Sequence, residues 1–234
     1  MAKAIRIDGG SRMLHVIGRC VSKDLMFPGD DDAQRFWSEI GYQSLEFGVQ
    51  ILAMCLLGNH YHLLVRGDAE PLANTMHRSL SKLANVRNRR EGRRGALVGR
   101  RYHVVHPQDA LHTSRLIRYV PMNPVLHKLA KDPAKWVWST HSILLGKRVA
   151  PEWFDREEVL KVFGFVDAEH YERFVLAGTP VVPPPMTSLE VKHHRVAVMV
   201  QAGMPLEQIV EVSGYSERHV LRLIAAHAAQ PRPA

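Results

Sequence analysis

Residues 49–66 read VQILAMCLLGNHYHLLVR, two apolar runs separated by Gly58-Asn59. The first run, residues 49–57, is short and strongly apolar, which is typical of a buried strand. Gly58-Asn59 is a turn signal, so residues 60–66 are expected to return beside the first run as the second strand of a hairpin. That strand begins with His60 and His62, which share one face because side chains two apart in a strand point the same way.

The two histidines allow two interpretations. Two neutral imidazoles that converge from one strand are a natural half of a metal site. They are equally typical of ordinary polar residues at the start of a strand. The chain has 14 histidines among 234 residues, so one pair with this spacing is expected by chance. The pair alone does not decide between the two.

The segments around this hairpin alternate between strand and helix patterns. Strand composition is found in residues 13–21 and 101–106, and helical spacing of apolar residues in 29–48, 70–90 and 108–130. The resulting order β-α-β-β-α-β-α predicts an α+β fold, a ferredoxin-like antiparallel sheet with helices on one face. Residues 151–178 are expected to add two short trailing helices, so that the first domain covers residues 1–178.

The C-terminal part of the chain has a different pattern. Residues 179–188, TPVVPPPMTS, predict a proline-rich, extended linker. Residues 189–234 contain three helical pieces with a tight joint between the second and the third, which favours a small all-α helix-turn-helix domain that binds duplex DNA. On the third piece Arg218 and Arg222 are expected to face outward together. A three-helix bundle used for protein contact is the alternative.

The charge of the chain is strongly positive and is concentrated in one segment. The formal net charge is +8, and residues 87–101 contain seven arginines and one acid, Glu91. Such a run predicts a phosphate-binding surface that positions nucleic acid through its backbone. A solvated loop that keeps the protein soluble is the alternative. The candidate DNA-binding residues are Arg78, Lys82, Arg87, Arg89, Arg90, Arg93, Arg94, Arg100 and Arg101.

Cysteine content and hydropathy indicate the cellular compartment in which the protein is expected. Cys20 and Cys55 are the two cysteines of the sequence, which is too few for a disulfide framework or a zinc cluster, and both are expected to be buried thiols. No apolar run approaches the length needed to span a membrane. We therefore expect a cytoplasmic, nucleoid-associated protein without a membrane partner.

A second group of candidate residues lies in residues 118–125, RYVPMNPV. On a helix Tyr119 and Asn123, four apart, lie on one face one turn apart. The carbonyl oxygen of Asn123 could then join His60 and His62 around Mg²⁺ or Mn²⁺, with Tyr119 within reach of the substrate that the ion polarises. The alternative is that Tyr119 is a residue at the boundary of an amphipathic helix and that Asn123 ends this helix before a proline.

These segments resemble a known family. LLGNHYHLLV resembles the HUH motif (His, bulky hydrophobic, His) of single-tyrosine HUH endonucleases, and RYVPMNPV resembles the tyrosine segment of REP-associated tyrosine transposases. RIDGGSRMLHVIGR, GRRYHVV, KWVWSTHSILLG and the trailing helices match in the family's order, over about residues 4–178 with a core of about 4–146. The Leu57-Gly58-Asn59 turn departs from the pattern because the family more often has a proline there.

The resemblance implies an HUH nuclease core in which His60, His62 and Asn123 bind Mg²⁺ or Mn²⁺ and Tyr119 is the nucleophile. It implies cutting of single-stranded DNA beside hairpin or repeat structure, with the 5′ phosphate left on Tyr119, by a monomer or a homodimer. Two alternatives stay open. One is a non-catalytic, sequence-specific DNA-binding regulator derived from a transposase, and the other is a metal-dependent hydrolase that acts through activated water.

Overall fold

The computed structural model describes residues 13–20, 25–92, 94, 97, 102–107 and 109–177, together with residues 206, 207, 210, 216–218, 220 and 221. The chain divides into two compact units, residues 1–182 and 183–234. The predicted linker and most of the predicted helix-turn-helix lie outside the described residues, so both stay predictions. Within the described part of the chain, no helix combines the length and the apolar character that crossing a membrane requires.

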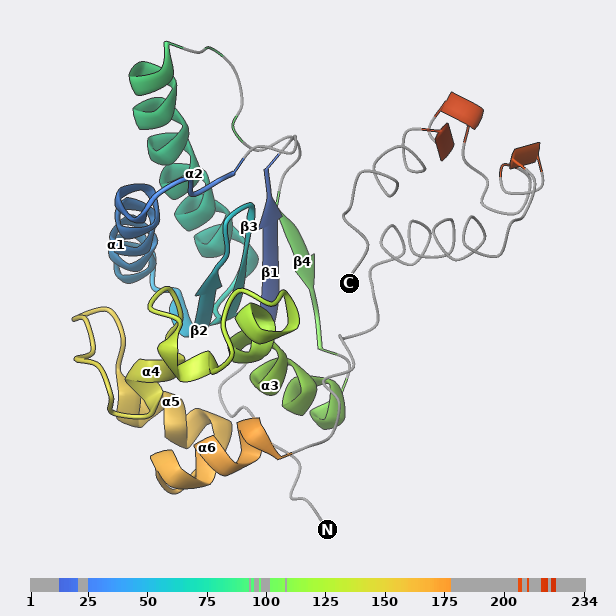
Figure 1. The fold of residues 1–234 in the computed structure, drawn as a ribbon. Helices are drawn as coiled ribbons and strands as arrows, with labels where there is room; N and C mark the ends of the chain where they lie inside the picture. Colours follow the sequence, from blue (N-terminus) through green and yellow to red (C-terminus); the bar gives the residue numbers. More distant parts are fainter. Residues whose placement is uncertain are drawn as a thin grey trace. The chain divides into compact units, whose positions relative to one another are not determined.

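The described part of the first unit is built on an antiparallel sheet. Its strands are β1 (Met13–Arg19), β2 (Gln50–Leu56), β3 (His60–Arg66) and β4 (His103–Val105), in the order β2-β3-β1-β4, and each neighbouring pair is antiparallel (Figure 1). This is the strand order of the ferredoxin-like arrangement. The predicted α+β class with an antiparallel sheet is confirmed.

The hairpin at residues 49–66 forms as the sequence predicts. The backbone N–H of Leu57 donates to the carbonyl oxygen of His60 at 2.8 Å and closes the turn. The carbonyl oxygen of Asn59 accepts from the N–H of Cys20 at 2.9 Å, which ties the turn to the residue after β1. Both bonds pin the start of β3, the strand that carries His60 and His62.

The helices cover both faces of the sheet, which corrects the expectation that they all lie on one face. Phe36 of α1 (Asp30–Glu46) packs against Tyr61 with ring centroids 5.2 Å apart, and α2 (Ala69–Glu91) packs beside α1 (Figure 1). Tyr119 of α3 (Ala110–Leu126) instead packs against His62, at 5.2 Å. Because Tyr61 and His62 are adjacent in β3, they point to opposite faces. The central strands are therefore buried on both sides.

The segment after α3 closes the outer edge of β2. The indole Nε1 of Trp136 donates to the carbonyl oxygen of Leu56 at 2.8 Å, and Ser139 forms a β-bridge with Cys55. The short helices η1 (Pro133–Lys135) and α4 (His141–Leu144) flank this segment. Neither is predicted from the sequence, because elements this short show no periodicity.

The predicted trailing helices are α5 (Arg156–Phe163) and α6 (Ala168–Leu176). Their attachment to the rest of the unit is partly polar. His141 and Tyr171 are both buried and share a hydrogen bond between Nδ1 and the phenol oxygen at 3.0 Å. Arg118 of α3 donates to the carbonyl oxygen of Phe174 at 3.0 Å. These two bonds join α6 to α4 and to the helix that carries Tyr119.

Candidate active site

Helix α3 presents a line of polar side chains to the histidines of β3. Tyr119, Asn123 and His127 are spaced four apart, so they follow one face of the helix. The Tyr119 ring lies 5.2 Å from the His62 ring, and the His127 ring lies 5.0 Å from the His60 ring. The tyrosine and the histidines that the sequence analysis singled out thus come together in the tertiary structure. Asn123 lies between the two ends of this line.

The side-chain amide of Asn123 is held by the backbone of its own helix, beside a carbonyl oxygen that a proline leaves without its usual donor. Pro121 and Pro124 are inside the helix, and Pro124 has no N–H to donate to the carbonyl oxygen four residues earlier, that of Val120. The Asn123 amide Nδ2 donates to the Tyr119 carbonyl oxygen at 2.8 Å and approaches the Val120 carbonyl oxygen at 3.5 Å. The NH₂ group is therefore committed to the helix backbone.

The other amide atom, Oδ1 of Asn123, is buried and has no hydrogen-bond partner. A buried acceptor without a partner costs about 1–3 kcal/mol, so a group that needs this oxygen would be favoured beside it. Amide oxygens are among the ligands that hard divalent ions take in proteins. This unpartnered oxygen makes the residues present compatible with a bound Mg²⁺ or Mn²⁺.

His60 is oriented by the residue before it. Its Nδ1 lies 2.7 Å from Oδ1 of Asn59, and a carbonyl oxygen can only accept a hydrogen bond. His60 therefore carries its hydrogen on Nδ1, and Nε2 carries the lone pair that a metal would bind. The turn residue Asn59 thus has a second role besides closing the hairpin.

His62 is oriented by a histidine that the sequence analysis did not single out. Its Nδ1 lies 3.0 Å from Nε2 of His15 on β1, and both side chains are buried. The register of β1 against β3 pairs Ile17 with His62, which puts His15 on the same face of the sheet. The sequence did carry a signal for this role, because His15 is a histidine within an otherwise apolar strand. The sequence did not show which strand lies beside β1, so the partner of His15 could not be inferred.

Burial keeps this group of histidines neutral. It lowers the pKa of His15 and that of His60 to about 3, and it lowers the pKa of His62 well below the usual range. Neighbouring imidazoles act in the same direction, and Arg19 does so for His60. Neutral imidazole is the form that binds metals. Among the described residues, no three His, Cys, Asp or Glu side chains converge on one metal position, so a metal here would depend on Asn123.

Among the predicted DNA-binding residues that the structure describes, Arg87 is placed in the interior. Its side chain is 4% exposed. The guanidinium donates to the carbonyl oxygens of Leu25 and Met26 and to the carboxylate of Glu91. It ties α2 to the segment before α1. This placement does not favour the predicted contact of Arg87 with DNA, since its donors are used within the fold.

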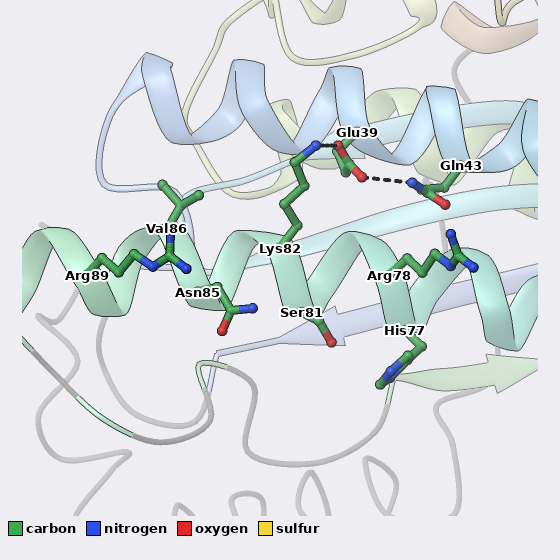
Figure 2. Close-up of a pocket in the computed structure, with 9 residues that line it drawn as sticks. All are labelled: Glu39, Gln43, His77, Arg78, Ser81, Lys82, Asn85, Val86 and Arg89. Carbon is green, nitrogen blue, oxygen red and sulfur yellow. Dashed lines mark hydrogen bonds and ion pairs between the residues drawn. The ribbon is translucent and has the colours of Figure 1, made fainter.

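The other basic residues of α2 lie on its exposed surface, beside α1 (Figure 2). The Lys82 ammonium pairs with Glu39, and Arg78 lies over the ring of Phe47 at 5.0 Å. Arg89 is exposed, and Arg90 pairs with the buried carboxylate of Asp32 at 2.8 Å. This surface belongs to the helices on the Tyr61 face of the sheet, whereas the histidines lie on the other face. It does not line the histidine group.

Arg94 and Arg218 are also exposed. The remaining predicted DNA-binding residues lie outside the described part of the chain, and their role stays a prediction; they are Arg93, Arg100, Arg101 and Arg222.

The fold resembles that of solved structures. The structure of a REP-associated tyrosine transposase bound to a REP hairpin is similar, with a TM-score of 0.48 and 14% sequence identity. The similarity covers 64% of this chain and 89% of that chain. No protein-family model matches the sequence, and no curated protein matches it.

Proposed function

We propose that this chain is a metal-dependent endonuclease and strand transferase that cuts single-stranded DNA through a covalent bond to Tyr119. One observation carries the proposal: Tyr119 packs on His62 while Asn123, one turn further along the same helix, holds a buried oxygen without a partner. If Tyr119 were only a packing residue and Asn123 only ended the helix, neither role would require an unpaired amide oxygen close to the histidines. The motif resemblance of the two segments points to the same chemistry.

His60, His62 and Asn123 would hold Mg²⁺ or Mn²⁺. Such an ion polarises a phosphate and stabilises charge that develops during displacement. His60 and His62 would bind through Nε2, and Asn123 through Oδ1, since its NH₂ group is committed to the backbone. An open ligand position would remain for a phosphate oxygen.

Tyr119 would act as the nucleophile. Its oxygen attacks the phosphorus in line, the bond from phosphorus to the 3′ oxygen breaks, and that oxygen leaves as a hydroxyl after it takes up a proton. The product is a 5′-phosphotyrosine, which is still a diester and can be attacked by another 3′ hydroxyl to rejoin DNA. Tyrosine ionises near pH 10 in water, so the positive charge of a bound divalent ion would be needed to favour loss of the phenol proton to water.

The DNA partner would be a single strand with hairpin or repeat structure. The exposed cations on α2, Arg78 and Arg89 among them, would contact phosphates on the helical face away from Tyr119. The C-terminal residues 189–234 would add duplex binding. Such contacts position the strand without reading its sequence.

The test is a search for a protein–DNA adduct that survives SDS. The protein would meet labelled single strands drawn from the DNA beside its own gene, with Mn²⁺ or Mg²⁺ or with EDTA. Tyr119→Phe removes the nucleophilic oxygen and should abolish the adduct while DNA binding stays within about twofold. Tyr42→Phe is the matched control, because Tyr42 is a 61% exposed tyrosine on α1 and its loss should change nothing.

Each outcome separates the candidates. An adduct that requires metal and Tyr119 supports the proposal. Cleavage without an adduct would replace it with hydrolysis by activated water. Tight binding to duplex DNA that survives EDTA, with no cleavage of any strand, would replace it with the regulator.

A further inference from the structure

His15 is a buried polar residue beside the candidate site, and it has no role in the chemistry proposed above. Its side chain is fully buried on β1 and shares one hydrogen bond with His62, between Nε2 of His15 and Nδ1 of His62. The two rings lie 5.2 Å apart and 19° from parallel. Nδ1 of His15 is buried and has no partner. An apolar residue would fill this place in the strand without leaving a polar atom unpaired. The presence of a histidine at this position therefore suggests a role other than packing.

The hydrogen bond between two neutral imidazoles can be made in two ways. If His15 donates from Nε2, then Nδ1 of His62 accepts, and the hydrogen of His62 sits on Nε2. If His62 donates from Nδ1, then Nε2 of His15 accepts, and Nε2 of His62 keeps its lone pair. In the first arrangement Nε2 of His62 cannot bind a metal. In the second it can, since each neutral imidazole has one N–H and one lone pair.

We propose, building on the function proposed above, that His15 is a positioning residue that accepts the Nδ1–H of His62 and thereby directs the Nε2 lone pair of His62 toward the metal. Asn59 does the same for His60 from the hairpin turn. The two proposed histidine ligands are thus each held by one neutral acceptor, one local in sequence and one from a neighbouring strand. Metal-binding histidines commonly hold their second nitrogen in such a bond.

The choice of a neutral acceptor has a consequence for charge. A carboxylate in place of His15 would be a buried anion beside the nucleophile Tyr119, whose ring lies 6.1 Å from that of His15, and it would oppose formation of the phenolate. An imidazole accepts the same hydrogen bond without charge. The second nitrogen of His15, Nδ1, then carries a hydrogen that has no acceptor in the protein interior. This unpaired N–H is the energetic cost of the arrangement.

The experiment measures metal affinity without DNA, by the signal of free Mn²⁺ in electron paramagnetic resonance. His15→Leu removes the acceptor, and Mn²⁺ binding should weaken by about 10- to 100-fold. His15→Gln can place Oε1 near the position of Nε2, so it should bind Mn²⁺ within about threefold of the parent. The matched control is His141→Leu, which also removes a buried, hydrogen-bonded histidine and should leave the affinity unchanged.

A second measurement needs no substitution. Nitrogen-15 spectra of the histidine rings, with and without Mg²⁺, report which nitrogen carries the hydrogen. His62 in the Mg²⁺-loaded protein should carry it on Nδ1. A hydrogen on Nε2 of His62 in the loaded protein would overturn the inference, and this holds even where His15→Leu fails to fold.

His62→Ala separates this inference from the proposed function. If His62→Ala binds Mn²⁺ as tightly as the parent, the proposed metal site itself is wrong, and the role of His15 falls with it. If His62→Ala loses Mn²⁺ while His15→Leu stays within twofold of the parent, the metal site stands and the role of His15 alone is refuted. An equal loss in His15→Gln and His15→Leu would also refute it, because packing rather than the acceptor would then matter.

Discussion

Gly18 is where a single methyl group should disturb the candidate site. Gly18 pairs with Tyr61 across β1 and β3, and the fully buried ring of Tyr61 lies directly on it. A Cβ at Gly18 would stand 2.2 Å from Cζ and Oη of Tyr61 and 2.4 Å from Cε1. Ordinary contact begins at 3.4 Å, so the ring would have to move by about 1.2 Å (3.4 − 2.2). Tyr61 sits between His60 and His62 in β3, so a shift that reaches its backbone would move both histidines.

The sign of the effect follows from two opposing magnitudes. Replacing a glycine by alanine in a compatible backbone stabilises a protein by about 0.4–1 kcal/mol, because the unfolded chain loses freedom. Overpacking of a core costs about 1–3 kcal/mol. The cost of overpacking is the larger effect here, because the Tyr61 ring is fully buried and its neighbours would have to move with it. Gly18→Ala should therefore lower the free energy of unfolding by the difference, up to about 2.6 kcal/mol (3 − 0.4), or the melting temperature by up to roughly 10 °C.

Urea and thermal unfolding followed by circular dichroism would measure this. Gly67→Ala is the control, because Gly67 follows β3 and a Cβ there meets Val49 at an ordinary 3.5 Å. Tyr61→Leu removes the clashing half of the ring, so Gly18→Ala should cost less in that background, with a coupling of about 0.5–3 kcal/mol. The reasoning is refuted if Gly18→Ala costs the same with Tyr61 or with Leu at that position.

Two further predictions concern histidine burial and the arginines of α2. Burial lowers the pKa of His141 to about 4, so the unfolded chain takes up this proton first, and the free energy of unfolding should fall as pH drops from about 6.5 toward 4. In urea titrations at stepped pH, His141→Leu should flatten this fall by up to about 1.4 kcal/mol per pH unit; an unchanged slope would contradict the role of burial. Arg87→Met should lower the free energy of unfolding by about 1–3 kcal/mol, because it leaves backbone carbonyls unpaired, whereas Arg89→Met should stay within about 0.5 kcal/mol. In anisotropy titrations with labelled single-stranded DNA, Arg89→Met should lower the salt slope by about 0.7 and Arg87→Met should leave it unchanged; the opposite ranking would place Arg87 at the DNA.

The local patterns of the sequence were sufficient for the secondary structure of the core. Residues 60–66 were expected as a strand and form β3 with those bounds. The spacing of Tyr119 and Asn123 correctly placed them on one face of a helix, since that depends on helix geometry alone. Both results rest on interactions between residues close in sequence.

Tertiary structure decided which faces meet. The sequence predicted helices on one side of the sheet, but α3 lies on the side opposite α1, where its tyrosine reaches His62. Tertiary structure also decided which arginines of α2 are exposed. The sequence does not distinguish Arg87 from Arg89, but the way α2 packs against its neighbours buries Arg87 and leaves Arg89 exposed.

His15 shows this division most clearly. The sequence by itself determined that His15, His60 and His62 belong to strands and that the last two share a face. Only the register of β1 against β3, formed between segments 47 residues apart, put Nε2 of His15 at 3.0 Å from Nδ1 of His62. The physical reason is that strand pairing satisfies backbone hydrogen bonds between distant segments, and the choice of partner depends on how the whole core packs.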